Sequence, residues 1–181
     1  MLPLGMKAPD FSLPDAVSGK TMSLKELAQG KALVVMFICN HCPYVKHVNA
    51  GIVQLAKDYQ PRGVQFVAIS SNDVLNYPDD APDKMKTVAQ EEAYPFPYLY
   101  DESQAVAKAY DAACTPDFYV FDGQLCLAYR GRLDESRPQS EVPVTGKDIR
   151  AALDAILAGQ SPDERQLPSV GCNIKWKKTG E

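Results

Sequence analysis

Leu33-Val-Val-Met-Phe-Ile-Cys39-Asn-His-Cys42-Pro-Tyr-Val45 is the stretch of this sequence that decides its fold. Its first six residues form a continuous apolar run of strand length, the pattern of a strand that a parallel sheet buries on both faces. Beyond the cysteines, apolar residues recur at helical spacing until Gln60-Pro-Arg-Gly63 supplies stop signals. The sequence therefore predicts a central strand, then a Cys-x-x-Cys pair, then a long amphipathic helix. The apolar positions of that helix are Val45, Val48, Ile52, Leu55 and Tyr59.

The remaining pattern predicts an α/β fold with a central mixed sheet flanked by helices. Val64–Ile69 is a second buried strand and completes a right-handed βαβ unit. Phe118–Phe121 and Gln124–Arg130 are expected to form an antiparallel hairpin, because Asp122-Gly123 is a strong two-residue turn signal. Shorter elements are expected as extended pieces within Phe11–Met22, a helix capped by Ser23, a helix over Pro82–Glu92, a strand over Tyr98–Tyr100, and helices over Gln104–Tyr110 and Asp148–Ala158.

Length and composition favour one ordinary globular domain over residues 1–181, with residues 161–181 as a tail that Ile174 and Trp176 dock on the body. The net charge is −4, and Lys and Arg cluster only in the tail, so nucleic acid is not an expected partner. No apolar stretch approaches the roughly 20 residues that cross a bilayer. Five cysteines, an odd number, disfavour a purely structural disulfide framework and favour a cytoplasmic protein with one functional pair.

The Cys-x-x-Cys pair lies where open α/β sheets place their functional sites, beyond the carboxyl end of a strand. The helix amino terminus favours a thiolate, so we expect Cys39, as the outer cysteine, to be the nucleophile. Cys42 would attack the mixed disulfide and act as the resolving cysteine. His41, if protonated, would lower the pKa of Cys39 further. Pro43 makes the first helical turn irregular, because the residue before a proline avoids helical dihedrals.

Other uses of the same cysteines stay open at this stage. One Cys-x-x-Cys motif is a weak signal taken alone, since cysteine is often a small buried hydrophobe. A zinc site from Cys39, Cys42, Cys172 and either His41 or His47 is the main chemical rival, although tetrahedral sites usually combine two well-spaced ligand couples. A metal-binding or redox-sensing module is therefore the non-enzymatic alternative, and no metal is assigned.

Thr115-Pro116, directly before the predicted hairpin, is the second informative feature. With the cysteine pair it resembles the thioredoxin-like superfamily, in which a cis-proline before the antiparallel hairpin faces the Cys-x-x-Cys motif. The resemblance implies a thioredoxin-like fold and a site that includes Thr115 and Pro116. A cis bond there would present the Thr115 backbone to a bound thiol partner.

Within that superfamily, nearly the whole chain resembles a peroxiredoxin-like redoxin subgroup that includes alkyl hydroperoxide reductase and thiol-specific antioxidant proteins. The segments that carry this resemblance are Ala8–Phe11, Cys39–Val45, Tyr129–Arg132 and Pro168–Trp176. The chain departs from the peroxiredoxin pattern Pro-x-x-x-Thr-x-x-Cys when that pattern is aligned on Cys39. Ala32 then stands in place of the proline and Met36 in place of the threonine. Peroxide reduction is therefore the second of the two enzyme functions that the sequence indicates.

Three further cysteines and two arginines are candidates for the site. Cys172 lies in the tail, and docking would bring its sulfur to the pair as a third redox thiol, with a buried packing role as the equal alternative. Cys114 lies near Pro116, and Cys126 is expected to be inert packing in a strand. Arg130 and Arg132 are more commonly solvated or paired than catalytic at such positions.

The sequence as a whole predicts a thiol–disulfide oxidoreductase that needs no organic cofactor. Its substrate would be a disulfide or thiol of a protein or small molecule, and its reducing partner a thioredoxin or glutathione system. The alternative enzyme is a thiol-dependent peroxidase, in which Cys39 becomes a sulfenic acid and condenses with Cys42 to form a disulfide.

Overall fold

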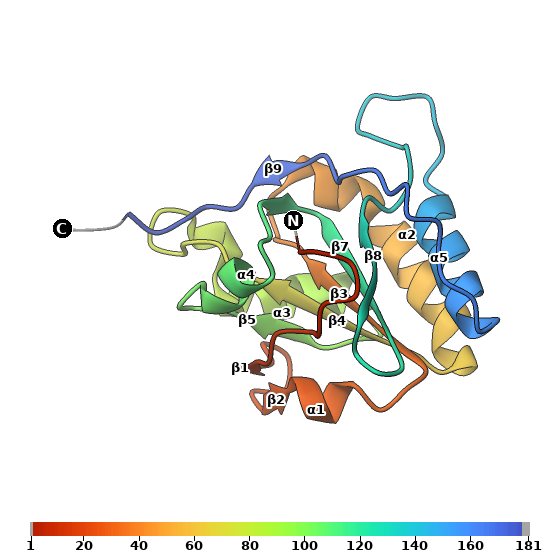
Figure 1. Ribbon diagram of the computed structural model, residues 1–181. Coiled ribbons are helices and arrows are strands. Elements are labelled where there is room, and N and C mark those ends of the chain that lie inside the picture. The colour runs from red at the N-terminus through yellow and green to blue at the C-terminus, as the bar shows by residue number, and fades with distance from the viewer. Residues whose placement is uncertain (1, 179–181) are drawn as a thin grey trace.

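A five-stranded sheet forms the centre of the protein in a computed structural model that describes residues 2–178 (Figure 1). The ends of the predicted domain, residue 1 and residues 179–181, lie outside the described part. The strand order is β5-β4-β3-β7-β8, so β3 is the central strand. Its neighbour β4 is parallel to it and β7 is antiparallel, which confirms the mixed sheet. The strands are β3 (Ala32–Phe37), β4 (Val64–Ser70), β5 (Tyr98–Tyr100), β7 (Asp117–Asp122) and β8 (Leu127–Gly131).

Three helices cover one face of this sheet. They are α2 (Pro43–Tyr59), α3 (Pro82–Glu91) and α5 (Lys147–Leu157). Val34 and Met36 of β3 point to this face and are fully buried against residues of all three helices. Side chains alternate along a strand, so the same strand sends Val35 and Phe37 to the opposite face. Burial on both faces explains why β3 is apolar throughout.

The opposite face is covered by shorter elements and by both ends of the described chain. These are α1 (Leu24–Leu27), α4 (Ala105–Ala109), the segment around Phe11, and Ile174 from the tail. Tyr110 lies at the centre of an aromatic cluster on this face, and its hydroxyl donates to the Pro9 carbonyl at 2.7 Å. Because the hydroxyl has this hydrogen-bond partner, burial of Tyr110 leaves no polar group unsatisfied.

The predicted N-terminal elements are present. The strands β1 (Ser12–Pro14) and β2 (Thr21–Ser23) pair antiparallel, and Ser23 caps α1 by accepting a hydrogen bond from the Glu26 N–H at 3.2 Å. After α2 the chain turns through the 3-10 helix η1 (Gln60–Arg62) and ends it at Gly63, whose φ of 92° suits glycine. A second 3-10 helix, η2 (Pro78–Asp80), lies between the strand that ends at Ser70 and the helix that begins at Pro82.

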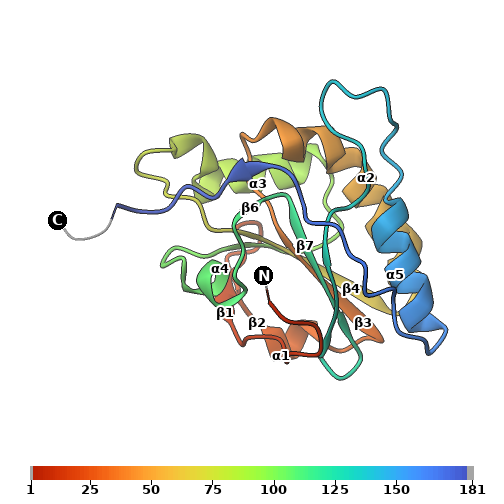
Figure 2. The same cartoon turned by 45° about the horizontal axis from the view of Figure 1, so that its top comes forward.

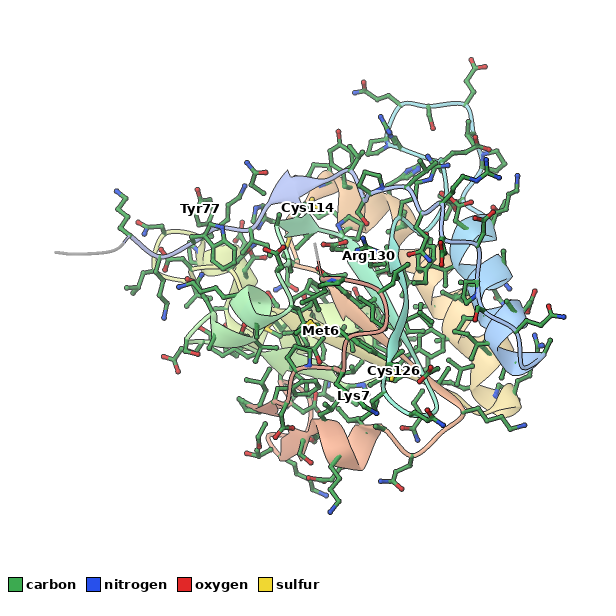
Figure 3. The ribbon with its side chains drawn as sticks, in the orientation of Figure 1. Met6, Lys7, Tyr77, Cys114, Cys126 and Arg130 are labelled. Atoms are coloured by element: carbon green, nitrogen blue, oxygen red, sulfur yellow. The ribbon has the colours of Figure 1, made fainter. Side chains whose placement is uncertain are left out.

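The turn of the β7-β8 hairpin differs from the prediction of a two-residue Asp-Gly turn. The connection spans residues 123–126, and Leu125 rather than Gly123 has positive φ. The Asp122 carboxylate accepts hydrogen bonds from the N–H groups of Gln124 and Cys126, and these bonds hold the wider loop. Cys126 therefore lies in this loop beside Lys7 rather than inside the strand, and both residues are labelled in Figure 3.

The C-terminal tail crosses the body and docks on it, as predicted. Its strand β9 (Cys172–Asn173) pairs antiparallel with β6 (Cys114–Thr115), and Figure 2 shows the tail running over β6. Ile174 is an anchor at 3% exposure, whereas Trp176 is 41% exposed. Trp176 instead lies under the ammonium group of Lys108, with 5.8 Å between Nζ and the ring centroid. None of the helices in residues 2–178 has the length and apolar character needed to cross a membrane.

The packing of α2 on the sheet gives a stability prediction. Ile52 is fully buried on the sheet-facing side of α2, while Lys57 of the same helix is exposed. We expect Ile52→Ala to lower the free energy of unfolding by about 2–5 kcal/mol, because it removes buried methyl groups and leaves a cavity. Lys57→Ala should change it by less than about 0.5 kcal/mol. Denaturant unfolding of both variants checks this, and equal losses would contradict the packing described.

Candidate active site

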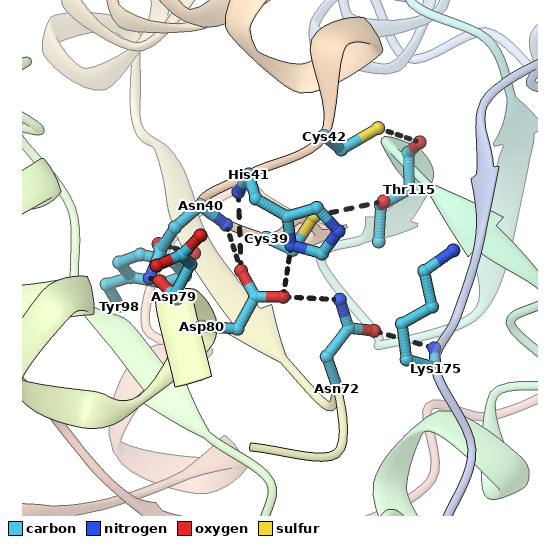
Figure 4. A network of polar contacts seen from close by, with 10 residues as sticks. All are labelled: Cys39, Asn40, His41, Cys42, Asn72, Asp79, Asp80, Tyr98, Thr115 and Lys175. Atoms are coloured by element: carbon cyan, nitrogen blue, oxygen red, sulfur yellow. Dashed lines mark hydrogen bonds and ion pairs between the residues drawn. The ribbon is translucent and has the colours of Figure 1, made fainter. Parts of the chain in front are cut away.

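The two motif cysteines lie directly beyond the carboxyl end of β3, opposite Thr115 (Figure 4). Cys39 Sγ is 3.4 Å from Thr115 Oγ1, and Cys42 Sγ is 3.5 Å from the Thr115 carbonyl oxygen. The Thr115–Pro116 peptide bond is cis. The fold thus brings together Cys39, Cys42, Thr115 and Pro116, four of the residues singled out from the sequence.

Both sulfur-bearing side chains are buried, which corrects the expectation that Cys39 is the outer member of the pair. The exposed fraction is 1% for Cys39 and 0% for Cys42. Thr115 covers both sulfurs from β6, and the tail strand β9 lies alongside it. Burial of this kind could not be read from the motif, because the covering segments lie more than seventy residues further along the chain.

The helix begins one residue after the second cysteine, not at the first. Pro43 is the first residue of α2, and Cys42 precedes it with extended dihedrals, φ −70° and ψ 124°. Proline has no N–H group and drives the residue before it out of the helical region, so the helix cannot begin earlier. The positive end of the helix dipole therefore acts first on Cys42, whereas the sequence-based expectation assigned this effect to Cys39.

The two thiols share one proton unequally in the reduced protein. A hydrogen bond from the Cys39 thiol, with further donors from Cys172 and the Val45 N–H, lowers the pKa of Cys42 to about 4 despite burial. The same hydrogen bond to Cys42, together with burial, raises the pKa of Cys39 far above its ordinary value. The hydrogen bond between the two sulfurs thus favours a Cys42 thiolate beside a Cys39 thiol, whereas the sequence predicts that Cys39 is the nucleophile. Which of the two attacks a substrate stays a prediction.

Asp80 organises the loop between the cysteines and was not singled out from the sequence. Its carboxylate is fully buried and accepts from the Asn40 N–H at 2.8 Å, the His41 N–H at 3.3 Å and Asn72 Nδ2 at 2.9 Å. Asp80 lies in η2, forty residues after the motif, in a proline-bearing segment with no periodic pattern. No local signal in the sequence connects it to the site (Figure 4).

His41 faces this carboxylate. Its Nδ1 lies 2.5 Å from Asp80 Oδ2, and its ring stacks on Tyr77 at 5.8 Å between centroids. We expected His41 to lower the pKa of Cys39, but the Asp80 charge contributes to raising it. The negative group nearest to Cys39 therefore reinforces the protonated state of that thiol.

One group of donor atoms has metal-binding spacing in the described part of the chain. Sγ of Cys39, a ring nitrogen of His41 and an oxygen of Asp80 all lie within 4.8 Å of one another. The hydrogen bonds to Asp80 account for its burial without an ion. The larger zinc set considered from the sequence is not assembled in the described residues, since Cys42 and Cys172 do not belong to this group. His47 instead contacts Ser136 Oγ through Nε2 at 2.7 Å.

The remaining candidates lie around the site in different ways. Arg132 is paired with Asp148, Nε to Oδ2 at 2.6 Å, and Arg130 lies on β8. Cys114 is labelled in Figure 3; burial raises its pKa to about 12, and its sulfur lies 3.9 Å from the Pro116 carbonyl oxygen. Cys172 is next to Cys42, because β9 pairs it with Thr115 and its side chain hydrogen-bonds to Cys42.

Comparison with known proteins adds family and fold. Residues 4–130 match the profile described as the AhpC/TSA family. The chain is 59% identical to an uncharacterized conserved protein from Geobacillus kaustophilus, with a TM-score of 0.97 over 99% of this chain and 95% of that one. A hypothetical protein from Sinorhizobium meliloti is 44% identical, with a TM-score of 0.96 and coverage of 99% and 97%. A peroxidoxin from Mycobacterium tuberculosis, 21% identical over 87% and 96%, shares the fold at a TM-score of 0.61. No curated protein sequence matched the chain.

The unequal sharing of the proton predicts how the reduced protein titrates. The ultraviolet absorbance of thiolate should first appear with a midpoint near pH 4, from Cys42. Cys39→Ala should raise that midpoint, because it removes the largest stabilising hydrogen bond, and Cys126→Ser should leave it unchanged. A midpoint at the ordinary thiol value in the unaltered protein would contradict the assignment.

Proposed function

This chain belongs to the AhpC/TSA family, and on that premise we propose that it is a thiol–disulfide oxidoreductase whose reactive pair is Cys42 and Cys39. Membership makes it an oxidoreductase that works through redox-active thiols. The observation that carries the proposal is the arrangement at Thr115, which contacts the sulfurs of both Cys39 and Cys42. The hydrogen bond between the two thiols also makes them unequal, because it lowers the pKa of Cys42 and raises that of Cys39. This is the pairing that a two-step dithiol exchange requires.

In the proposed reaction, the Cys42 thiolate attacks one sulfur of a disulfide. The disulfide breaks, one sulfur leaves as a thiolate that takes up a proton, and the other stays bonded to Cys42. Cys39 then loses its proton and attacks Cys42 Sγ, which releases the second sulfur as a thiol. The substrate has gained two electrons from the pair, one proton from Cys39 and one from solvent, and Cys39–Cys42 is a disulfide. The reverse sequence oxidises a dithiol.

The raised pKa of Cys39 makes its deprotonation the demanding step. His41 and Asp80 are the groups at hand to accept the proton, because their side-chain atoms lie within 4.8 Å of the Cys39 sulfur. A nearby acceptor matters most where the thiol is buried away from water. We therefore assign Asp80 and His41 to the second step of the exchange.

Asp80→Asn should slow the second step while leaving attack by Cys42 largely intact, since asparagine keeps the shape but cannot accept the proton. Asp79→Asn is the matched control, because the Asp79 side chain is exposed and only its backbone carbonyl contacts the motif. Single-turnover trapping should show the mixed disulfide accumulating by roughly tenfold or more in the Asp80 variant alone. Equal accumulation in both variants, or in neither, would remove Asp80 from the step.

The proposed partners follow from the same chemistry. Thiol or peroxide substrates and a redox partner are the class that the family implies. A disulfide of a protein or small molecule would be the substrate, and a thioredoxin or glutathione system would return the pair to its reduced form. We propose a reducing compartment such as the cytoplasm, because five cysteines, an odd number, do not fit a purely structural disulfide framework.

A thiol peroxidase is the second candidate, favoured by the family match and by the stabilised Cys42 thiolate. Peroxide would oxidise that thiolate to a sulfenic acid, and Cys39 would condense with it to give the same Cys39–Cys42 disulfide and water. Both reactions therefore end on the same disulfide and differ in the oxidant.

Parallel assays of insulin-disulfide reduction and hydrogen-peroxide consumption separate the two candidates. We expect the disulfide to be the better substrate. Cys42→Ser should lower that turnover by more than about 100-fold, and Cys39→Ser should stop after a single round of exchange. Cys126→Ser is the control and should keep full activity, because its sulfur lies in the β7-β8 loop. Faster peroxide consumption with negligible disulfide reduction would reverse the ranking.

A further inference from the structure

The tail of the protein occupies the backbone edge that faces the cysteine pair. In the antiparallel pairing of β6 and β9, Thr115 is opposite Cys172 and Cys114 is opposite Asn173. Thr115 is also the residue whose atoms contact both buried sulfurs. An external chain cannot pair with Thr115 while β9 is there, so the group presented to Cys42 is the side chain of Cys172.

The tail can approach Thr115 this closely because Gly171 has no side chain. A Cβ built on Gly171 would lie 1.9 Å from the Thr115 carbonyl oxygen and 3.2 Å from Pro116 Cδ. Because the first distance is far below any real contact, every other residue at this position would push the tail away. The docking of Cys172 thus requires a glycine at position 171.

Anchors on both sides hold Cys172 in place. Ile174 is buried, and its N–H donates to the Ala113 carbonyl at 3.1 Å. The next residue, Lys175, donates its N–H to Asn72 Oδ1 at 2.8 Å, and Asn72 in turn donates to Asp80. Before the glycine, Ser169 Oγ donates to the Gly131 carbonyl at 2.6 Å. Figure 4 shows the Lys175 contact reaching the Asp80 cluster.

Exposure separates the three sulfurs. Cys39 and Cys42 are buried, whereas Cys172 is half-buried and also hydrogen-bonds to Cys42. It is the thiol that can contact both the pair and a molecule outside. Resting on the proposed function, we propose that Cys172 is a third redox thiol that meets the external disulfide or dithiol and relays the exchange to Cys42.

The relay balances as three exchanges of sulfur bonds. Cys172, as its thiolate, attacks an external disulfide and releases one thiol. The Cys42 thiolate then attacks Cys172 Sγ, which releases the second external thiol and leaves a Cys42–Cys172 disulfide. Cys39 gives up its proton and attacks Cys42, so Cys172 returns as a thiol and Cys39–Cys42 becomes the disulfide. The external disulfide gains two electrons and two protons. The pair supplies both electrons and the Cys39 proton, and solvent supplies the second proton.

The same steps in reverse reduce the Cys39–Cys42 disulfide with two electrons from an external dithiol. Burial and the neighbouring Cys42 thiolate raise the pKa of Cys172 to about 11 in the reduced protein. Once Cys42 is in a disulfide its charge is gone, and the nearby Lys175 favours a Cys172 thiolate. Cys172 is therefore a better nucleophile towards Cys42 when Cys39 and Cys42 form a disulfide, which is the state in which the pair has to be reduced. Cys42 is in turn a good leaving group from Cys172, because its own pKa is low.

Two variants of the full chain test the relay, with Cys126→Ser as control. Cys172→Ser should lower turnover with insulin disulfide by at least about tenfold, and Gly171→Ala should also lower it, because the tail and its sulfur are displaced. If the tail only covers the pair, Gly171→Ala will raise turnover and Cys172→Ser will leave it unchanged. Either of these results overturns the relay while the proposed function stands.

A bond-mapping experiment tests the relay independently of turnover. Cys39→Ser, treated with one equivalent of glutathione disulfide and digested, should yield a peptide pair linked through Cys42 and Cys172. That link supports the relay even if the unaltered enzyme proves inactive on disulfides, in which case only the proposed function fails. Glutathione left on Cys42, with Cys172 free to be alkylated, overturns the relay.

Discussion

The approach of Thr115 to the cysteine pair is the interaction on which the rest of the site depends. Its side-chain oxygen contacts Cys39, its carbonyl oxygen faces Cys42, and its strand partner is Cys172. The two sulfurs of the motif and a third from the distant tail therefore meet at one residue of a two-residue strand. The sheet makes this possible, because β3 and β7 run side by side and deliver the motif and Thr115 to the same edge.

The surroundings of the two motif thiols shift their pKa values in opposite directions. The hydrogen bond between the two thiols favours negative charge on Cys42 and keeps the proton on Cys39, and burial and the Asp80 charge add to the second effect. A buried carboxylate beside a thiol would be costly if unpaired, and here it is stabilised by the backbone and side-chain donors that shape the loop. Asp80 thus fixes the loop between the cysteines and contributes to the raised pKa of Cys39.

Much of the fold was predictable because its signals are local. The apolar run of β3, the periodicity of α2 and the Ser23 cap each depend on residues close in sequence, and all three are present. The hairpin turn was predicted wrongly, because the Asp122 side chain captures two N–H groups and holds a wider loop. The identity of the cysteine pair was likewise visible, but the burial of both sulfurs was not.

The features that sequence reasoning missed are those set by tertiary contacts. Asp80 joins the motif only through folding, and the position of the helix end at Cys42 depends on how Pro43 is accommodated. Gly171 has no turn to form and reads as an ordinary tail residue until its contact with Thr115 is seen. The order of ionisation of the two thiols follows from these contacts rather than from their order in the chain.

The central claim is that Cys39 and Cys42 are the pair that stores the two electrons. The most direct measurement is peptide mapping of the unaltered protein after equilibration with an oxidising thiol–disulfide buffer and rapid alkylation. The account predicts a Cys39–Cys42 disulfide, with Cys114, Cys126 and Cys172 alkylated. Alkylated Cys39 and Cys42 in fully equilibrated protein would contradict it.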